Sequence, residues 1–181
     1  MAFESAMIPL GTPCPDFTLP DVEGRIRSRD EFRAPLLLVV VMCNHCPYVQ
    51  AVDDRINDLA RSFAGRCDVV GINPNDSAAY PEDGFEGMKH RAALKGYLFP
   101  YLRDEGQDVA RAFGAGCTPD FFLYNADRRL VYRGRLDDNW KDASTVQTHE
   151  LRDAIETVLA GRGLTQPQKP SMGCGIKWTK P

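Results

Sequence analysis

Two cysteines separated by two residues are the part of this 181-residue chain that is best suited to chemistry. The run Cys43-Asn44-His45-Cys46 follows an apolar stretch, residues 36–42, and precedes a helical pattern. Backbone N–H groups and the dipole at a helix N-terminus stabilise a thiolate and lower its pKa. We therefore predict that Cys43, at the mouth of the site, is the attacking thiolate. Cys46, one helical turn further on, would resolve a mixed disulfide, with Asn44 and His45 supporting the pair.

Zinc binding and inert packing are the alternatives for this cysteine pair. Structural zinc usually needs four protein ligands, and the sequence has no second pair of cysteines at metal-ligand spacing. In a reducing compartment, a close pair that follows a strand favours redox chemistry, and we predict no metal and no organic cofactor. The remaining cysteines are isolated: Cys14, Cys67, Cys117 and Cys174.

The composition is that of one soluble globular domain. Hydrophobic residues make up 43% of the chain and charged residues 26%, and the formal net charge is −3. Lys and Arg are scattered, which argues against nucleic-acid or anionic-membrane partners. The first ten residues lack the pattern of a secretory signal, and the longest apolar run is too short to span a bilayer. We expect a cytoplasmic protein that is a monomer or a homodimer.

The periodicity of apolar residues predicts an α/β fold with a mixed sheet and helices on both faces. An N-terminal hairpin precedes the apolar strand 36–42, and a strand–helix unit is inserted later in the chain. The predicted strands are residues 17–20, 25–27, 36–42, 67–72, 99–102, 121–124 and 130–132. The predicted helices are residues 47–63, 81–94, with Leu94 among its core positions, 107–113 and 151–159.

The last part of the chain, residues 164–181, is rich in Pro and Gly and is predicted to be an extended tail on a domain of residues 1–163. An extended chain from Gly163 to Cys174 could reach roughly 34 Å. Cys174 could therefore visit the active site or a neighbouring subunit as a resolving thiol. The alternative is a docked or idle tail.

The run Cys117-Thr118-Pro119 stands directly before a predicted strand. A proline there can simply start a strand. Together with the cysteine pair, however, it resembles the thioredoxin superfamily. The resemblance implies a thioredoxin fold up to about Leu159, a cis peptide bond before Pro119, and Thr118 backbone groups that meet a substrate strand. It would also bring Cys117 close to the pair, as a redox thiol, a metal ligand or a packed side chain.

Within this superfamily, the chain is most similar to the peroxiredoxin-like branch of alkyl hydroperoxide reductases and thiol-specific antioxidants. The shared features are Cys-Asn-His-Cys-Pro-Tyr-Val, Asn-Asp-x-x-x-Tyr-Pro-Glu-Asp, Thr-Pro-Asp-Phe-Phe-Leu and a tail with Ile-Lys-Trp. The branch pattern, Pro-x-x-x-Thr-x-x-Cys, would place its peroxidatic cysteine at Cys46. Its Pro and Thr are replaced by Val39 and Cys43, and its activating Arg falls near Pro119. The peroxidase reaction needs those groups to stabilise developing charge.

Thioredoxin itself also differs from this chain. Its buried Asp six residues before the first cysteine is replaced by Leu37, and its Trp before the pair by Met42. We predict a thiol–disulfide oxidoreductase that uses Cys43 and Cys46 with a thioredoxin- or glutathione-type electron donor. The alternatives are a peroxidase that uses Cys46, and a zinc- or copper-binding module on Cys43, Cys46 and His45 with Cys117.

Overall fold

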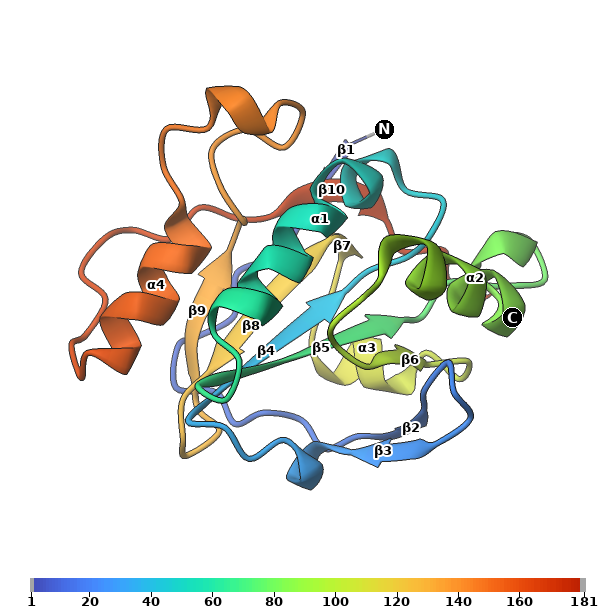
Figure 1. Ribbon diagram of the computed structural model, residues 1–181, viewed down its shortest axis with the longest axis horizontal. Coiled ribbons are helices and arrows are strands. Elements are labelled where there is room, and N and C mark those ends of the chain that lie inside the picture. The colour runs from blue at the N-terminus through green and yellow to red at the C-terminus, as the bar shows by residue number, and fades with distance from the viewer. Residues whose placement is uncertain (1, 180–181) are drawn as a thin grey trace.

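A mixed five-stranded sheet with helices on both faces forms the centre of the protein in a computed structural model, which describes residues 2–179 (Figure 1). Its strand order is β6-β5-β4-β8-β9, with β5 parallel to β4, β6 parallel to β5, and β8 and β9 joined antiparallel on the other side. The predicted α/β architecture is confirmed. The strands are β4 (Leu36–Val41), β5 (Cys67–Asn73), β6 (Tyr101–Arg103), β8 (Asp120–Tyr124) and β9 (Leu130–Gly134).

Two smaller sheets complete the β structure. The predicted N-terminal hairpin is confirmed as β2 (Thr18–Pro20) and β3 (Ile26–Ser28). A three-stranded sheet joins the two ends of the chain, in the order β1 (Ala2–Glu4), β10 (Met172–Gly175) and β7 (Cys117–Thr118). The helices are α1 (Pro47–Ser62), α2 (Phe85–Lys95), α3 (Asp108–Ala112) and α4 (Glu150–Leu159). In residues 2–179, none of the helices is long and apolar enough to cross a membrane.

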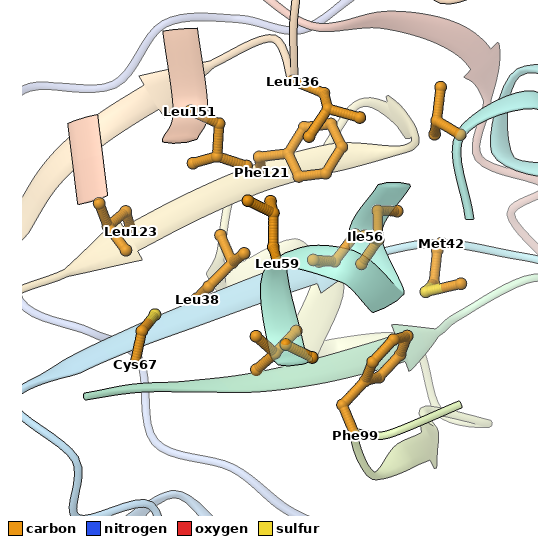
Figure 2. Close-up of a cluster of buried hydrophobic side chains, with 14 of the residues drawn as sticks. Leu38, Met42, Ile56, Leu59, Cys67, Phe99, Phe121, Leu123, Leu136 and Leu151 are labelled. Carbon is orange, nitrogen blue, oxygen red and sulfur yellow. The ribbon is translucent and has the colours of Figure 1, made fainter. Parts of the chain in front are cut away.

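Strand β4 is buried on both faces because every residue in it is apolar. Leu38 and Val40 point to the face covered by α1 and α4, where they join Ile56 of α1 in one core (Figure 2). Leu37 and Val39 point to the opposite face and join a second core that includes α3. This alternation follows from the two-residue period of a strand. The unbroken apolar run therefore supports both layers of the fold.

The segment predicted as one helix from 81 to 94 is divided in the structure. A 3-10 turn, Pro81–Asp83, comes first, and α2 begins only after Gly84. The turn packs so closely on α2 that a Cβ at Gly87 would lie 2.1 Å from the Glu82 carbonyl oxygen, a separation only glycine allows. The prediction that Leu94 is a core residue is wrong: its side chain lies in the last turn of α2 and is 68% exposed.

A buried ion pair fixes the segment that leads into β8. Arg133 and Asp120 are both fully buried and form a salt bridge of 3.2 Å. Arg133 Nη2 also donates to the Gly114 carbonyl oxygen at 3.2 Å, and Asp120 Oδ2 accepts from the Gly116 N–H at 3.2 Å. The pair therefore holds the chain on both sides of the Thr118-Pro119 bond.

Replacing one partner of this pair should destabilise the protein strongly. Arg133→Met leaves a buried carboxylate without its counter-charge, which typically costs about 3–5 kcal/mol. Arg61→Met is the control, because the Arg61–Asp58 pair is mostly exposed and such pairs contribute less than about 1 kcal/mol. The free energy of unfolding in urea would measure both variants. An equal loss of unfolding free energy in the two variants would contradict the conclusion that the buried pair stabilises this segment.

Candidate active site

The register of the central sheet brings the two sequence motifs together. Asp120 at the start of β8 lies opposite Val41 at the end of β4. Because the strands are antiparallel, Thr118 and Pro119, just before β8, lie beside the residues that follow β4. The bond between Thr118 and Pro119 is cis, as the resemblance implied. The Cys43–Cys46 loop and this proline therefore face each other.

Both thiols of the pair meet Thr118. Cys43 Sγ lies 3.3 Å from the Thr118 hydroxyl oxygen, and Cys46 Sγ lies 3.1 Å from the Thr118 carbonyl oxygen. Cys43 is 1% exposed and Cys46 is fully buried. A single residue thus contacts both sulfur atoms, and solvent has almost no access to either.

Helix α1 begins at Pro47, so that Cys46 is its N-cap and Cys43 lies in the loop before it. Proline suits the first helical position because its missing N–H would have no partner there. This differs from the prediction that Cys43 stands at the helix mouth and Cys46 one turn inside the helix. The thiol that benefits from the helix N-terminus is that of Cys46.

The electrostatics of the pair agree with this placement. A hydrogen bond from the Cys43 thiol lowers the pKa of Cys46 to about 5, although burial opposes the shift. The Cys174 thiol, Thr118 and the Val49 N–H lower it further. The pKa of Cys43 is raised, first by its hydrogen bond to Cys46 and then by burial and the Asp83 carboxylate. The thiolate therefore belongs to Cys46, and Cys43 keeps its proton.

Proton position also decides how Cys46 contacts Thr118. As a thiol, Cys46 donates to the carbonyl oxygen, whereas a thiolate has no proton to donate. The hydrogen-bond donors around Cys46 have a larger effect on its pKa than this one carbonyl acceptor, so the pKa of Cys46 is lowered. We therefore assign the thiolate to Cys46, opposite to the sequence-based expectation for Cys43.

The buried carboxylate of Asp83 holds the Cys43–Cys46 loop against the inserted segment. It accepts from the Asn44 N–H at 2.6 Å and from Asn75 Nδ2 at 2.8 Å, and it also binds His45 Nδ1. Asp83 is fully buried, so these bonds are needed to offset its desolvation. His45, which the sequence analysis assigned a supporting role, is thus oriented by a carboxylate.

Further contacts orient Asn44 and His45. The Tyr101 hydroxyl donates to Asn44 Oδ1 at 3.0 Å, and Gln50 Nε2 donates to the Asn44 carbonyl oxygen at 2.8 Å. The His45 ring stacks on Tyr80 with centroids 4.5 Å apart. The supporting residues named from the sequence are therefore held in place by side chains of β6, α1 and the inserted segment.

The remaining cysteines separate into two groups. Cys174, on β10, pairs in register with Thr118, the residue that contacts both thiols, so the structure brings Cys174 to the pair. Cys117 Sγ instead contacts the Pro119 and Ser171 carbonyl oxygens at 3.6 and 3.9 Å. Cys14 and Cys67 are buried, and burial raises the pKa of each to about 12. Their burial and raised pKa agree with a packing role for Cys14 and Cys67.

Three side chains have atoms close enough together to share a metal ion. Cys43, His45 and Asp83 each offer a ligand atom within 4.8 Å of the other two, and in residues 2–179 they form the one such cluster. The set differs from the one weighed from the sequence, because Asp83 takes the place of Cys46 and Cys117. The Asp83 carboxylate already accepts bonds from Asn44 and Asn75, so a metal would compete with those bonds for its oxygens.

Comparison with known proteins places this arrangement in a family. The model of the AhpC/TSA family matches residues 10–133, and the chain belongs to that family. No curated protein matched the sequence. The resemblance identified from the cysteine and proline motifs is therefore confirmed.

Solved structures show the same fold at two levels of similarity. An uncharacterized conserved protein from Geobacillus kaustophilus is 42% identical, with 99% of this chain and 97% of that one covered and a TM-score of 0.94. A hypothetical protein from Sinorhizobium meliloti is 44% identical, with coverage of 97% and 98% and a TM-score of 0.93. A peroxidoxin from Mycobacterium tuberculosis is 20% identical over 87% of this chain and 100% of that one, with a TM-score of 0.62. The predicted thioredoxin-like fold is confirmed.

Sequence reasoning did not identify Asp83, Asn75 or Tyr101 as site residues. A signal for the first two was present, because the Asn-Asp-x-x-x-Tyr-Pro-Glu-Asp run begins at Asn75 and ends at Asp83. We used that run only as evidence of resemblance. Tyr101 carried no signal of its own, since its reach to Asn44 depends on how β6 pairs with β5.

The assignment of the thiolate to Cys46 and of the proton to Cys43 predicts a specific titration. The ultraviolet absorbance of a thiolate should appear in the reduced protein with a midpoint near pH 5, from Cys46. Cys43→Ala removes the principal hydrogen-bond donor and should move this midpoint upward, whereas Cys43→Ser keeps a donor and should move it less. Cys46→Ser should abolish the transition. A midpoint that stays near 5 in Cys46→Ser and disappears in Cys43→Ser would assign the thiolate to the other cysteine.

Proposed function

We propose that the protein is a thiol–disulfide oxidoreductase in which Cys46 is the nucleophile and Cys43 the resolving thiol. The observation that carries this proposal is the pair of thiols at the N-terminus of α1, with both sulfurs against Thr118. Family membership supports thiol-based redox chemistry. A structural relative from Bacteroides vulgatus, the thioredoxin domain of a thiol-disulfide oxidoreductase, shares the fold at 14% identity, 84% and 99% coverage and a TM-score of 0.65.

The exchange begins at Cys46. Its thiolate attacks one sulfur of a substrate disulfide, the substrate S–S bond breaks, and the other half of the substrate leaves as a thiolate. Cys43 then loses its proton and attacks Cys46 Sγ. The Cys43–Cys46 disulfide forms, and the second half of the substrate leaves with the electron pair. The substrate has gained two electrons and the cysteine pair has lost two, which a thioredoxin- or glutathione-type donor would restore.

Asp83 is suited to assist the second step. One of its carboxylate oxygens lies within 4.8 Å of Cys43 Sγ. Its charge raises the pKa of Cys43 and keeps that thiol protonated until it is needed. The same carboxylate is close enough to accept the proton that Cys43 must lose. We therefore assign Asp83 the role of proton acceptor for the resolving thiol.

Trapping of the mixed disulfide tests these roles. With Cys174 also replaced by Ser, Cys43→Ser cannot resolve the intermediate, so incubation with glutathione disulfide should leave glutathione bound to Cys46 in most molecules. Cys46→Ser lacks the nucleophile and should form roughly a tenth or less of that adduct in the same time. Mass spectrometry of the intact protein and of its peptides would measure both.

Two results would contradict the proposed function. Trapping at Cys43 in the Cys46→Ser variant would reverse the roles. Stoichiometric zinc or copper in protein purified without reductant, bound through Cys43, would favour the metal-binding alternative. Cys14→Ser serves as a control, since that thiol is buried away from the pair and its pKa is raised.

A peroxidase is the second candidate, and the lowered pKa of Cys46 favours it. Hydrogen peroxide would convert this thiolate to a sulfenic acid, which Cys43 could attack with release of water. In residues 2–179, however, the groups that principally shift the Cys46 pKa are thiols, Thr118 and a backbone amide, with no arginine among them. None of these groups would place a positive charge beside the peroxide oxygens, where negative charge develops.

Rates with the two oxidants separate these candidates. We expect glutathione disulfide to oxidise the pair faster than hydrogen peroxide at equal concentration. The missing cation should slow the peroxide reaction by roughly 10²- to 10³-fold, the usual loss when one charge-stabilising donor is removed. Stopped-flow fluorescence or quenched alkylation would give both rates. A peroxide rate that exceeds the disulfide rate, survives in Cys43→Ser and disappears in Cys46→Ser would establish the peroxidase.

A further inference from the structure

The strand edge beside the cysteine pair is occupied by the protein's own C-terminal tail. Strand β10 pairs antiparallel with β7, so that Cys174 lies opposite Thr118 and Gly175 opposite Cys117. On its other edge, β10 pairs with β1 (Figure 1). An exposed edge of this kind is a natural site for an added strand from another protein. Here the added strand comes from the same chain.

The tail is seated specifically at this edge. A Cβ at Gly173 would lie 2.0 Å from the Thr118 carbonyl oxygen, so no larger residue could take its place without displacing the strand. A Cβ at Gly175 would meet no atom within 4 Å. Beyond the strand, the Lys177 N–H donates to Asn75 Oδ1 at 2.9 Å, and Arg111 lies 4.2 Å over the ring of Trp178. Docking therefore extends along the tail on both sides of Cys174.

The docked tail places a third sulfur between the buried pair and solvent. Cys43 and Cys46 are at most 1% exposed, whereas Cys174 is only partly buried. Cys174 packs against the core that holds both other cysteines, and its partner in register, Thr118, contacts both of their sulfur atoms. A thiol reagent from solution therefore meets Cys174 before it can meet the pair.

We propose that Cys174 is a third redox thiol, which carries the disulfide from the buried pair to the protein surface for reduction by a small thiol. This inference rests on the proposed function, because the Cys43–Cys46 disulfide is its starting point. The electron donor is then a low-molecular-weight thiol of the glutathione type, which can reach Cys174 while the tail stays docked.

The first step is an exchange within the chain. Cys174 loses its proton to solvent and attacks Cys46 Sγ; the Cys46–Cys174 bond forms and the Cys43–Cys46 bond breaks. The electron pair leaves with Cys43 Sγ, which takes up a proton, and there is no net oxidation. The reduced Cys46 helps to raise the pKa of Cys174 to about 11, after burial. That contribution disappears once Cys46 is in a disulfide, so Cys174 becomes more acidic when it is required.

The second step takes place at the surface. A small thiolate attacks Cys174 Sγ, the accessible sulfur, and Cys46 leaves as a thiolate. The thiol with the lower pKa is the better leaving group, and the pKa of Cys46 is about 5. A second small thiol then attacks the mixed disulfide at its own sulfur, so that Cys174 is released and a small disulfide is formed. Two small thiols have supplied the two electrons.

Disulfide mapping tests the inference on the full-length protein. After oxidation by glutathione disulfide and alkylation of free thiols, we expect a Cys46–Cys174 bond in the wild-type protein and in Gly175→Ala. The Gly173→Ala variant, with its tail displaced, should contain mainly the Cys43–Cys46 bond. Fragmentation of linked peptides identifies the sulfurs involved, and Cys43→Ser should accumulate the Cys46–Cys174 bond.

The rate of reduction by glutathione distinguishes relay from simple shielding. Cys174→Ser keeps the covering strand and removes the relay thiol, so its Cys43–Cys46 disulfide should be reduced roughly tenfold or more slowly than the wild-type protein. Adding Gly173→Ala to that variant should restore fast reduction by exposing the pair. Gly175→Ala alone should match the wild-type rate.

Each negative result has a distinct meaning. The relay would be overturned, and the proposed oxidoreductase left intact, if Cys174→Ser were reduced at the wild-type rate and Cys174 of the wild-type protein stayed a free thiol throughout oxidation. Failure of Cys43 and Cys46 to form any disulfide in both wild-type and Cys174→Ser proteins would overturn the proposed function and the relay with it.

Discussion

The antiparallel register of β8 on β4 is the constraint on which the site depends. It sets Asp120 opposite Val41 and so places Thr118 and Pro119 beside the loop that follows β4. A shift by one residue would turn every side chain of β8 to the other face, which the two apolar cores forbid. The buried ion pair of Asp120 and Arg133 also holds this segment in place. Core packing therefore determines how far Thr118 lies from the sulfur atoms.

A second buried charge, that of Asp83, couples the inserted segment to the chemistry. Its carboxylate has no access to solvent and is bonded to Asn44, His45 and Asn75. Asn75 in turn accepts from the Lys177 N–H of the tail. The loop with the cysteines, the insert and the tail thus share one hydrogen-bond network. Networks of this kind are costly when partly satisfied, which gives the tail a reason to stay docked.

The sequence was sufficient to predict the elements with strong periodicity and not the contacts between them. The apolar run of β4 and the amphipathic pattern of α1 are local signals, and both elements form where expected. Pro47 was a local signal too, and as a first helical residue it could have identified Cys46 as the N-cap. Asp83 and Gly173 carry no local signal of this kind, because the role of each depends on a partner far away in the sequence. A Gly-rich tail has no periodicity that could predict its pairing with β7.

The replacement of threonine by Cys43 in the family pattern changes what the site can do after its first oxidation. A thiol at this position still lowers the pKa of Cys46, because it can donate a hydrogen bond as a hydroxyl would. Unlike a hydroxyl, it can also form a disulfide with Cys46. Under the proposed function, two thiols can therefore pair with Cys46: Cys43 within the loop and Cys174 on the docked strand. Stabilising the Cys46 thiolate favours the reduced form over either disulfide, and it makes Cys46 a good leaving group when a small thiol attacks Cys174. Such a site is better suited to passing disulfides on than to storing them.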